Sequence, residues 1–176
     1  MSWGYDPIAV LMEEHQVFLR RLREARRVLG SVPADEPARS VARSSAADFA
    51  RFLAEDVDAF HGRKEEEALF PALARHMETD GGPVGVMLED HATLREHQST
   101  LARDAGRLER DLDSAEAWSG IRAATGSVDE LLRFHIDKED RVLFPMAREI
   151  LSPGEMREVT EICRQIEQRL DSARRT

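Results

Sequence analysis

Two stretches of the chain place a histidine four residues before a glutamate within the same surrounding pattern. They read FHGRKEEEALFP at residues 60–71 and FHIDKEDRVLFP at residues 134–145, so His61 precedes Glu65 and His135 precedes Glu139. On an α-helix, residues four apart lie on one face. Each pair therefore offers an imidazole nitrogen and a carboxylate oxygen to one point, a donor set that suits iron or manganese, with zinc also possible.

A second repeated motif precedes each of these stretches. The segments LMEEH at 11–15 and MLEDH at 87–91 end in His15 and His91, which are 76 positions apart, while His61 and His135 are 74 apart. The chain thus contains an internal repeat. It predicts two similar helical hairpins, each with a histidine on its first helix and a histidine and a glutamate on its second.

These six residues lie on or beside the apolar stripes of their predicted helices. A single histidine on such a stripe is usually a hydrogen-bonded core residue, and a single His-x-x-x-Glu is usually a surface pair. Two buried carboxylates, in contrast, cost several kcal/mol each unless something compensates for them. A pair of divalent cations would do so, and the sequence therefore predicts a dinuclear metal site with the candidate ligands His15, His61, Glu65, His91, His135 and Glu139.

The elements that must position these residues are predicted to be helices, because strand signals are nearly absent. One helix starts at Asp6-Pro7 and ends at Gly30, and a second runs from about residue 38 to a break or kink that Pro71 predicts near Phe70. A third follows the breaker TDGGP at 79–83, with Leu88 in its apolar stripe. Capping-box patterns open a fourth at Asp113 and Glu116, with Val142 in its stripe, and a fifth at Ser152 and Glu155.

Four long helices with short loops predict an all-α fold, an antiparallel up-and-down four-helix bundle with a pseudo-two-fold repeat of helical hairpins. The bundle is expected over about 6–148, with an additional C-terminal helix over about 153–171 on its outside or end. No linker divides the chain, so residues 1–176 are expected to form a single domain.

Composition limits the partners. The net charge of −9 argues against nucleic acid or an anionic membrane surface. No apolar run approaches the roughly 18–20 residues that span a bilayer, and the N-terminus lacks the pattern of a secretory signal. Cys163 is the single cysteine, so an internal disulfide is impossible, and a cytoplasmic location is the default expectation.

Taken together, the motifs resemble those of the hemerythrin-like, His-His-Glu cation-binding family over about 6–148. The resemblance implies a four-helix bundle around a non-haem di-iron centre with an oxo or hydroxo bridge. It also implies the four motif histidines as terminal ligands and Glu65 and Glu139 as bridging carboxylates. Ferritin-like bundles match less well, because they use Glu-x-x-His.

The chain departs from the oxygen carriers of that family at one position. The carriers have a fifth histidine one turn after the ligand on the third helix, where this chain has Arg95. His97 lies about 120° away around the helix and is a poor substitute, and His76 is expected at the surface. Asp140 is a rival to Glu139 as ligand, although the match between the two halves favours Glu139.

Several neighbours are expected to have secondary roles. Glu66 and Asp140 are expected around the ligands or in solvent, and Arg95 either turns toward the site or reaches solvent. Glu14 and Asp90 precede ligand histidines and are expected to face outward or contact a neighbouring helix. Lys64 and Lys138 recur without a predicted special role, and the expected packing residues are Trp3, Trp118 and Cys163.

The resemblance implies a protein that binds and reacts with O2, peroxide or nitric oxide, as a monomer or homodimer. With four histidines and two carboxylates, open metal positions favour turnover, including catalase-like peroxide disproportionation, over reversible O2 carriage. The alternatives are a regulatory or iron-handling module without turnover, and a helical interaction protein with packed histidines.

Overall fold

The computed structural model describes residues 5–174, which are helical throughout with short connections and contain no strand. This confirms the predicted all-helical class. The segments are α1 (Pro7–Leu29), α2 (Glu36–Phe52), η1 (Leu53–Gly62), η2 (Glu65–Leu69), α3 (Phe70–Leu73), α4 (Pro83–Leu108), α5 (Ala115–Lys138), η3 (Glu139–Leu143), α6 (Phe144–Ile150) and α7 (Pro153–Arg174), where η marks π-helical turns.

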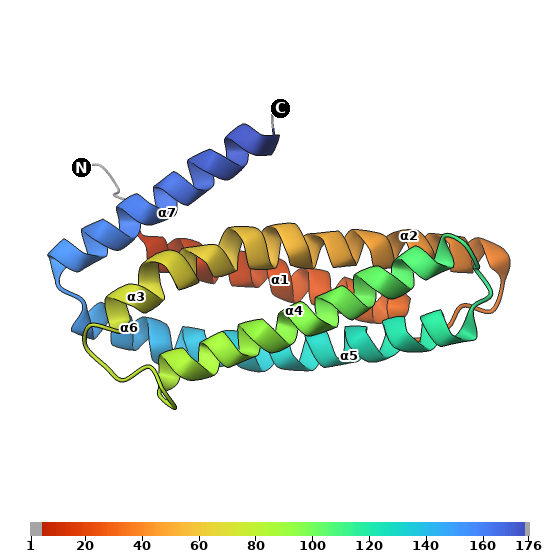
Figure 1. The fold of residues 1–176 in the computed structure, drawn as a ribbon, viewed down its shortest axis with the longest axis horizontal. Helices are drawn as coiled ribbons and strands as arrows, with labels where there is room; N and C mark the ends of the chain where they lie inside the picture. The colour runs from red at the N-terminus through yellow and green to blue at the C-terminus, as the bar shows by residue number, and fades with distance from the viewer. Residues whose placement is uncertain (1–4, 175–176) are drawn as a thin grey trace.

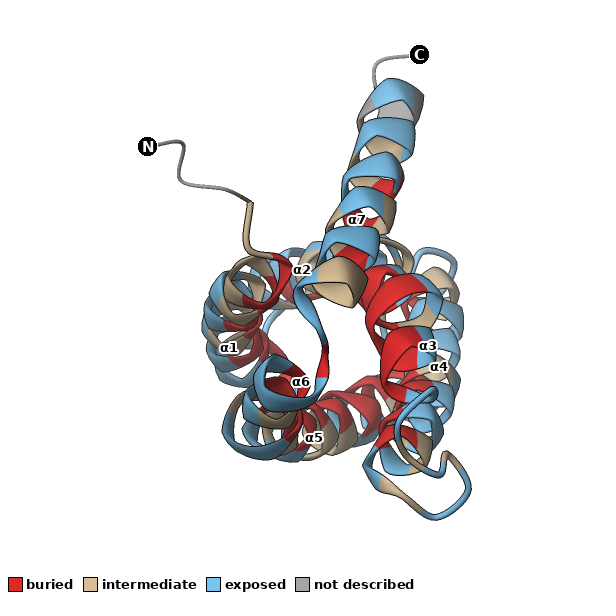
Figure 2. Cartoon of the chain, turned by 90° about the vertical axis from the view of Figure 1, so that its left-hand side faces the viewer, coloured by how far each residue is buried: buried red, intermediate tan, exposed pale blue. Residues whose placement is uncertain are grey.

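The segments combine into four long helical stretches and one separate helix. One stretch runs from α2 through η1 and η2 to α3, and another runs from α5 through η3 to α6. Neighbouring contacts join α1 to α2 and α5, and α4 to α2 and α5, so each of the four stretches has two neighbours. Figure 2 shows them around a common interior toward which the buried residues face.

Side chains close the helix ends much as the sequence predicts. The Asp6 carboxylate accepts hydrogen bonds from the first N–H groups of α1, and Ser152 and Glu155 form a reciprocal capping box at α7. At α5, however, the capping residue is Ser114 rather than Asp113, because the Ser114 hydroxyl accepts the N–H of Ala117.

Of the break or kink expected near Phe70, the break is absent, because the helical stretch continues through Pro71 to Leu73; instead the α-helical geometry gives way to a π-helical turn that ends at Leu69. The N–H of Phe70 bonds the carbonyl of Glu65, five residues earlier. The second repeat does the same, from Phe144 to Glu139. These wide turns accommodate a proline, which cannot donate a helical hydrogen bond. Two of the three π-helical segments, η2 and η3, begin at the glutamate of a His-x-x-x-Glu motif, whereas η1 begins earlier, at Leu53.

The π-helical turn also shifts the register of the apolar stripe. Val142, predicted to face the core, is 51% exposed, while the next residue, Leu143, is buried. An extra residue in the turn moves the inward position one residue along the chain. Leu88 is likewise 40% exposed, because the inward row of α4 runs through Met87 and His91 instead.

The last helix, α7, lies against one side of the molecule. It contacts η2, η1 and α1 and leaves the four long stretches at an angle (Figure 1). Cys163 is buried on its inner face, and burial raises the pKa of this thiol to about 12, so it is a packed rather than a reactive thiol. Trp118 is buried, whereas Trp3 lies outside the described residues. Within residues 5–174, no helix is long and apolar enough to cross a membrane.

Candidate metal centre

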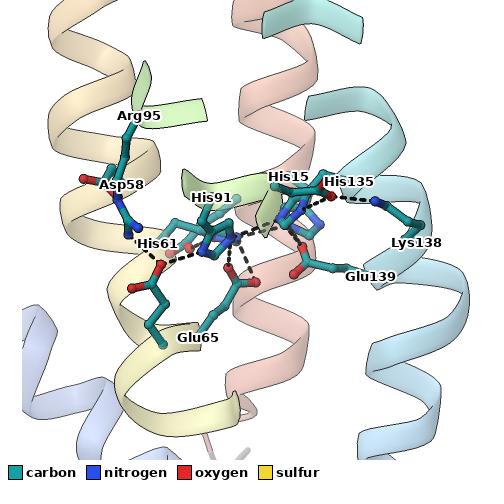
Figure 3. A network of polar contacts seen from close by, with 12 residues as sticks. His15, Asp58, His61, Glu65, His91, Arg95, His135, Lys138 and Glu139 are labelled. Atoms are coloured by element: carbon teal, nitrogen blue, oxygen red, sulfur yellow. Dashed lines mark hydrogen bonds and ion pairs between the residues drawn. The ribbon is translucent and has the colours of Figure 1, made fainter. Parts of the chain in front are cut away.

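The structure brings all six predicted ligand residues together in the interior. The first metal-binding group consists of His15, His61, Glu65 and Glu139, and the second of His91, His135 and the same two glutamates. All six residues are buried. In each group, one ligand atom per residue lies within 4.8 Å of all the others. Figure 3 shows these side chains turned toward one another.

Each glutamate spans the two groups. The Glu139 Oε2 lies 3.2 Å from the Nε2 atoms of both His15 and His135. The two oxygens of Glu65 lie 3.2 Å from the Nε2 of His61 and 3.4 Å from that of His91. Within each group the two histidine Nε2 atoms are 3.1 or 3.2 Å apart. A carboxylate placed between two histidine pairs has the position that a bridging ligand needs.

The oxygens of these glutamates test whether the cluster fits metal ions. All four are fully buried, and none has a hydrogen bond in the described structure, even though imidazole nitrogens lie nearby. Buried carboxylate oxygens without partners are costly. Cations between the carboxylates and the Nε2 atoms would compensate both sets of groups, so the residues fit a metal centre.

A second layer of carboxylates orients the four rings. An ionised carboxylate can only accept a hydrogen bond, so each Nδ1 must donate, and the lone pair of each neutral ring then lies on Nε2, toward the centre. The four pairs, with their nitrogen-to-oxygen distances, are His15–Asp140 at 2.8 Å, His61–Glu14 at 2.8 Å, His91–Glu66 at 2.7 Å and His135–Asp90 at 3.2 Å.

Only part of this layer was predicted from the sequence. Glu66 and Asp140 were expected around the ligands or in solvent, whereas Glu14 and Asp90 were expected to face outward or to contact a neighbouring helix. The signal was present, because each of these two residues directly precedes a ligand histidine at equivalent positions of the repeat. The rival ligand Asp140 lies in this outer layer, while Glu139 lies in the inner cluster.

The carboxylates shift the pKa values of the histidines. Burial alone would lower the pKa of His15, but the hydrogen bond to Asp140 and the nearby Glu139 outweigh it and raise it to about 9. At the other two rings the neighbouring carboxylates likewise outweigh burial, and they raise the pKa of His91 to about 10 and that of His135 to about 9. Burial would raise the pKa of Glu65, but His61 and His91 hold it well below its usual value. Metal binding at this site would therefore displace protons.

Arg95 acts on the site through a carboxylate. Its guanidinium donates to Asp58 over 2.7 Å and to Glu66 over 2.5 Å, and Glu66 is the partner of His91. The side chain is 42% exposed, so it lies at the surface and supports the outer layer. The other two histidines are elsewhere. His97 belongs to neither group, and His76 pairs with Glu155 near the surface.

A small cavity of about 10 Å³ adjoins the histidine rings. This volume holds about one water-sized molecule. Val57, Leu94 and Leu132 give it apolar walls, and Gly62 leaves space beside the ring of His91. The remaining lining residues are Asp58, His61, His91 and His135. The site thus has a small, largely apolar space on its histidine side.

Comparison with known proteins agrees with this geometry. A family model described as the hemerythrin HHE cation binding domain matches residues 6–147, so the chain belongs to the hemerythrin HHE family. Among curated proteins it is 28% identical over 88 residues to an iron-sulfur cluster repair protein YtfE from Enterobacter sp. (strain 638). It is 27% identical over 88 residues to the protein of that name from Escherichia coli O157:H7. Each match covers 49% of this chain and 40% of the relative, so the chain matches about two fifths of the relatives' length.

Proposed function

We propose that the chain is a non-haem di-iron protein that reacts with O2, peroxide or nitric oxide in oxidative or nitrosative stress. The observation that carries the proposal is the pair of buried glutamates, each within reach of both histidine pairs and without a hydrogen bond. Two ferrous ions held there would together supply two electrons to a small oxidant.

The donor set supports iron. Imidazole and carboxylate ligands suit iron, manganese and zinc, and thiolate ligands are absent from both groups. The membership of the chain in a cation-binding family and the names of its iron-sulfur repair relatives favour iron among these metals.

The protein's own residues would have distinct tasks in this chemistry. The carboxylates at Nδ1 fix the ring orientations, and Glu65 and Glu139 would each contribute to holding both ions. Six protein ligands leave positions free for a small molecule, because two six-coordinate ions need more donors than these side chains supply. The cavity with Val57, Leu94 and Leu132 in its wall would admit molecules of about the size of water and exclude larger ones.

The function is tested with protein loaded anaerobically with ferrous iron. We expect about two irons per chain, rapid oxidation by O2, and catalysed peroxide loss or nitric oxide consumption. These activities should disappear in Glu65→Ala and persist in Glu67→Ala, whose carboxylate is surface-exposed. A stable oxygenated form that returns fully to the ferrous state over many cycles, without peroxide loss, would contradict the proposal.

An iron-handling role is the second candidate, favoured by the names of the relatives that the chain resembles. In that role, iron is supplied to an acceptor and the redox reactions are secondary. Transfer of iron from loaded protein to an acceptor faster than to buffer, without peroxide turnover, would favour it over the first.

Several structural features belong to the proposal as well. The four long helical stretches are proposed to be an antiparallel up-and-down bundle with pseudo-two-fold symmetry, and residues 1–176 a single domain, cytoplasmic and monomeric or dimeric. Two observations support the bundle. The four long stretches lie side by side in Figure 1, and the two halves of the chain supply equivalent residues to the buried cluster.

A further inference from the structure

The two metal-binding groups differ in what lies behind their outer carboxylates. In the first group, Glu14 accepts a hydrogen bond from His61 and another from Lys64. In the second group, Asp90 accepts the equivalent bonds from His135 and from Lys138, the latter over 2.5 Å. The residues are equivalent in the repeat, so both groups have the same series of contacts from histidine to carboxylate to lysine.

The lysines are in contrasting surroundings. The Lys64 side chain is completely buried, whereas that of Lys138 is 40% exposed. The Lys64 ammonium also lies 3.4 Å from Glu167 of α7 and 4.1 Å from the ring centroid of Phe60. Glu167 in turn accepts a hydrogen bond from the Tyr5 hydroxyl over 2.7 Å. The helix α7 therefore covers the first lysine and places a second carboxylate on it.

We infer that Lys64 and Glu167 are positioning residues through which α7 fixes the ligand His61, so that the His15–His61 metal position is retained while the His91–His135 position exchanges first. This inference rests on the proposed iron centre and adds that the two ions differ in how readily they are released. It assigns a role to α7, whose contacts reach the centre through Lys64 and Glu14.

The physical reason is the difference in solvent access. Groups that orient a metal-bound histidine influence metal affinity by about 10–100-fold. A buried ion pair is stronger than the same pair in water, because water neither screens it nor competes for its hydrogen bonds. His15 is fully buried, whereas His91 retains 7% exposure, and Arg95 beside it is itself 42% exposed. Water and chelator therefore reach the second position more easily.

The test is the release of iron from fully loaded, reduced protein to a ferrous chelator, with the initial iron content measured first. We expect two phases of equal amplitude in the wild type. Anomalous scattering from crystals of half-emptied protein should locate the retained iron at His15 and His61. Lys64→Met should accelerate the slow phase by about 10-fold, and Lys64→Arg should restore part of the difference.

Matched variants separate this role from general stability. Lys138→Met should change the slow phase by less than about 2-fold, since Lys138 is itself 40% exposed and its contacts lead to the other metal position. Glu167→Gln removes the carboxylate charge that α7 places beside Lys64, without leaving a cavity. It should accelerate the slow phase, as Lys64→Met does. Melting temperatures of the metal-free variants show whether any change arises from unfolding.

The outcomes are distinct from those that test the proposed reaction. Single-phase release in the wild type, retained iron at His91 and His135, or equal effects of Lys64→Met and Lys138→Met would overturn the inference, even if peroxide and nitric oxide chemistry were present. Two-phase release with the expected variants would support it even if that chemistry were absent. An initial content well below one iron per chain would contradict the iron centre itself.

Discussion

The two halves of the chain are alike in the buried cluster that they share and differ toward the surface. Residues 60–71 and 134–145 each supply a histidine and a glutamate to the buried cluster, one outer carboxylate (Glu66 or Asp140) and a π-helical turn that starts at the glutamate. Toward the surface they diverge. Ala68 is buried, while its equivalent Val142 is 51% exposed, and Lys64 and Lys138 differ in the same direction. The difference indicates that the repeat is retained where the two halves share ligands and is lost where α7 covers only one of them.

The largest expected effect tests the similarity of the halves. Glu65→Ala and Glu139→Ala should each abolish binding at both metal positions, because each carboxylate belongs to both groups. Elemental analysis after iron-replete expression should give close to zero iron per chain for both. Glu67→Ala is the matched control and should retain iron. If one variant kept two irons and the other lost them, the two glutamates would not be equivalent.

A second substitution pair tests the difference between the halves. Ala68→Asp places a carboxylate in a buried position beside α7, and we expect it to destabilise the fold by roughly 3–5 kcal/mol, as an unpaired buried charge does. Val142→Asp, at the equivalent exposed position, should change stability by less than about 0.5 kcal/mol. Urea unfolding of the metal-free proteins measures both. Equal effects would show that Val142 is also covered, for example by a second copy of the chain.

The pH dependence of stability follows from the raised histidine pKa values. In the metal-free protein, His15 and His135 have pKa values of about 9 and His91 of about 10, above the ordinary value of 6.5. Their contribution to stability is therefore fully present below about pH 6.5 and is lost as the pH rises through 9 to 10. Unfolding of metal-free protein between pH 6.5 and 10 should show this loss.

Iron-loaded protein should respond in the opposite sense, because protons and metal compete for the same nitrogens. Its affinity for iron should fall as the pH is lowered. A metal-free protein whose histidine-dependent stability increased toward pH 10 would contradict the contacts described for both halves.

The smallest expected effect concerns a charged contact at the site that has no equivalent in the first half. Arg95 pairs with Asp58 and Glu66, whereas the equivalent of Arg95 in the first half is Leu19. Arg95→Leu should cost less than about 1 kcal/mol of stability, as expected for an exposed ion pair. Iron release from the His91 position should become faster by less than about 10-fold, since Glu66 keeps its bond to His91. Arg63→Leu is the control, because it breaks the exposed Arg63–Glu67 pair, in which neither residue pairs with a histidine.

The helices and the meeting of the six inner residues could be predicted because they follow from local rules. Apolar residues at helical spacing predicted the rows through His15, His61, His91 and His135, which are buried in the structure. The doubled His-x-x-x-Glu motif predicted that six residues would meet, because a repeat places equivalent residues on facing elements. The capping box at Ser152 and Glu155 was likewise a local signal and is present.

The features that were not predicted depend on tertiary geometry, which local sequence rules do not describe. Pro71 was expected to break or kink its helix, but the stretch is not broken, because the preceding turn widens to i→i+5 hydrogen bonds. The same widening turns Val142 away from the core and leaves it 51% exposed, whereas its equivalent Ala68, in the turn that α7 contacts, is buried. Glu14 and Asp90 were expected to face outward or to contact a neighbouring helix, and they do contact one. Which ring each of them holds was not predictable, because His61 and His135 lie more than 40 positions away.

By itself, then, the sequence determined the helical class, the repeat and the six residues that meet, since spacing along a helix fixes which side chains share a face. Only the tertiary structure decided which carboxylate holds which ring, and that α7 buries Lys64 while Lys138 stays exposed. Those outcomes depend on contacts between segments far apart in the chain. The energy of such contacts comes from burial, which exists only once the helices have packed.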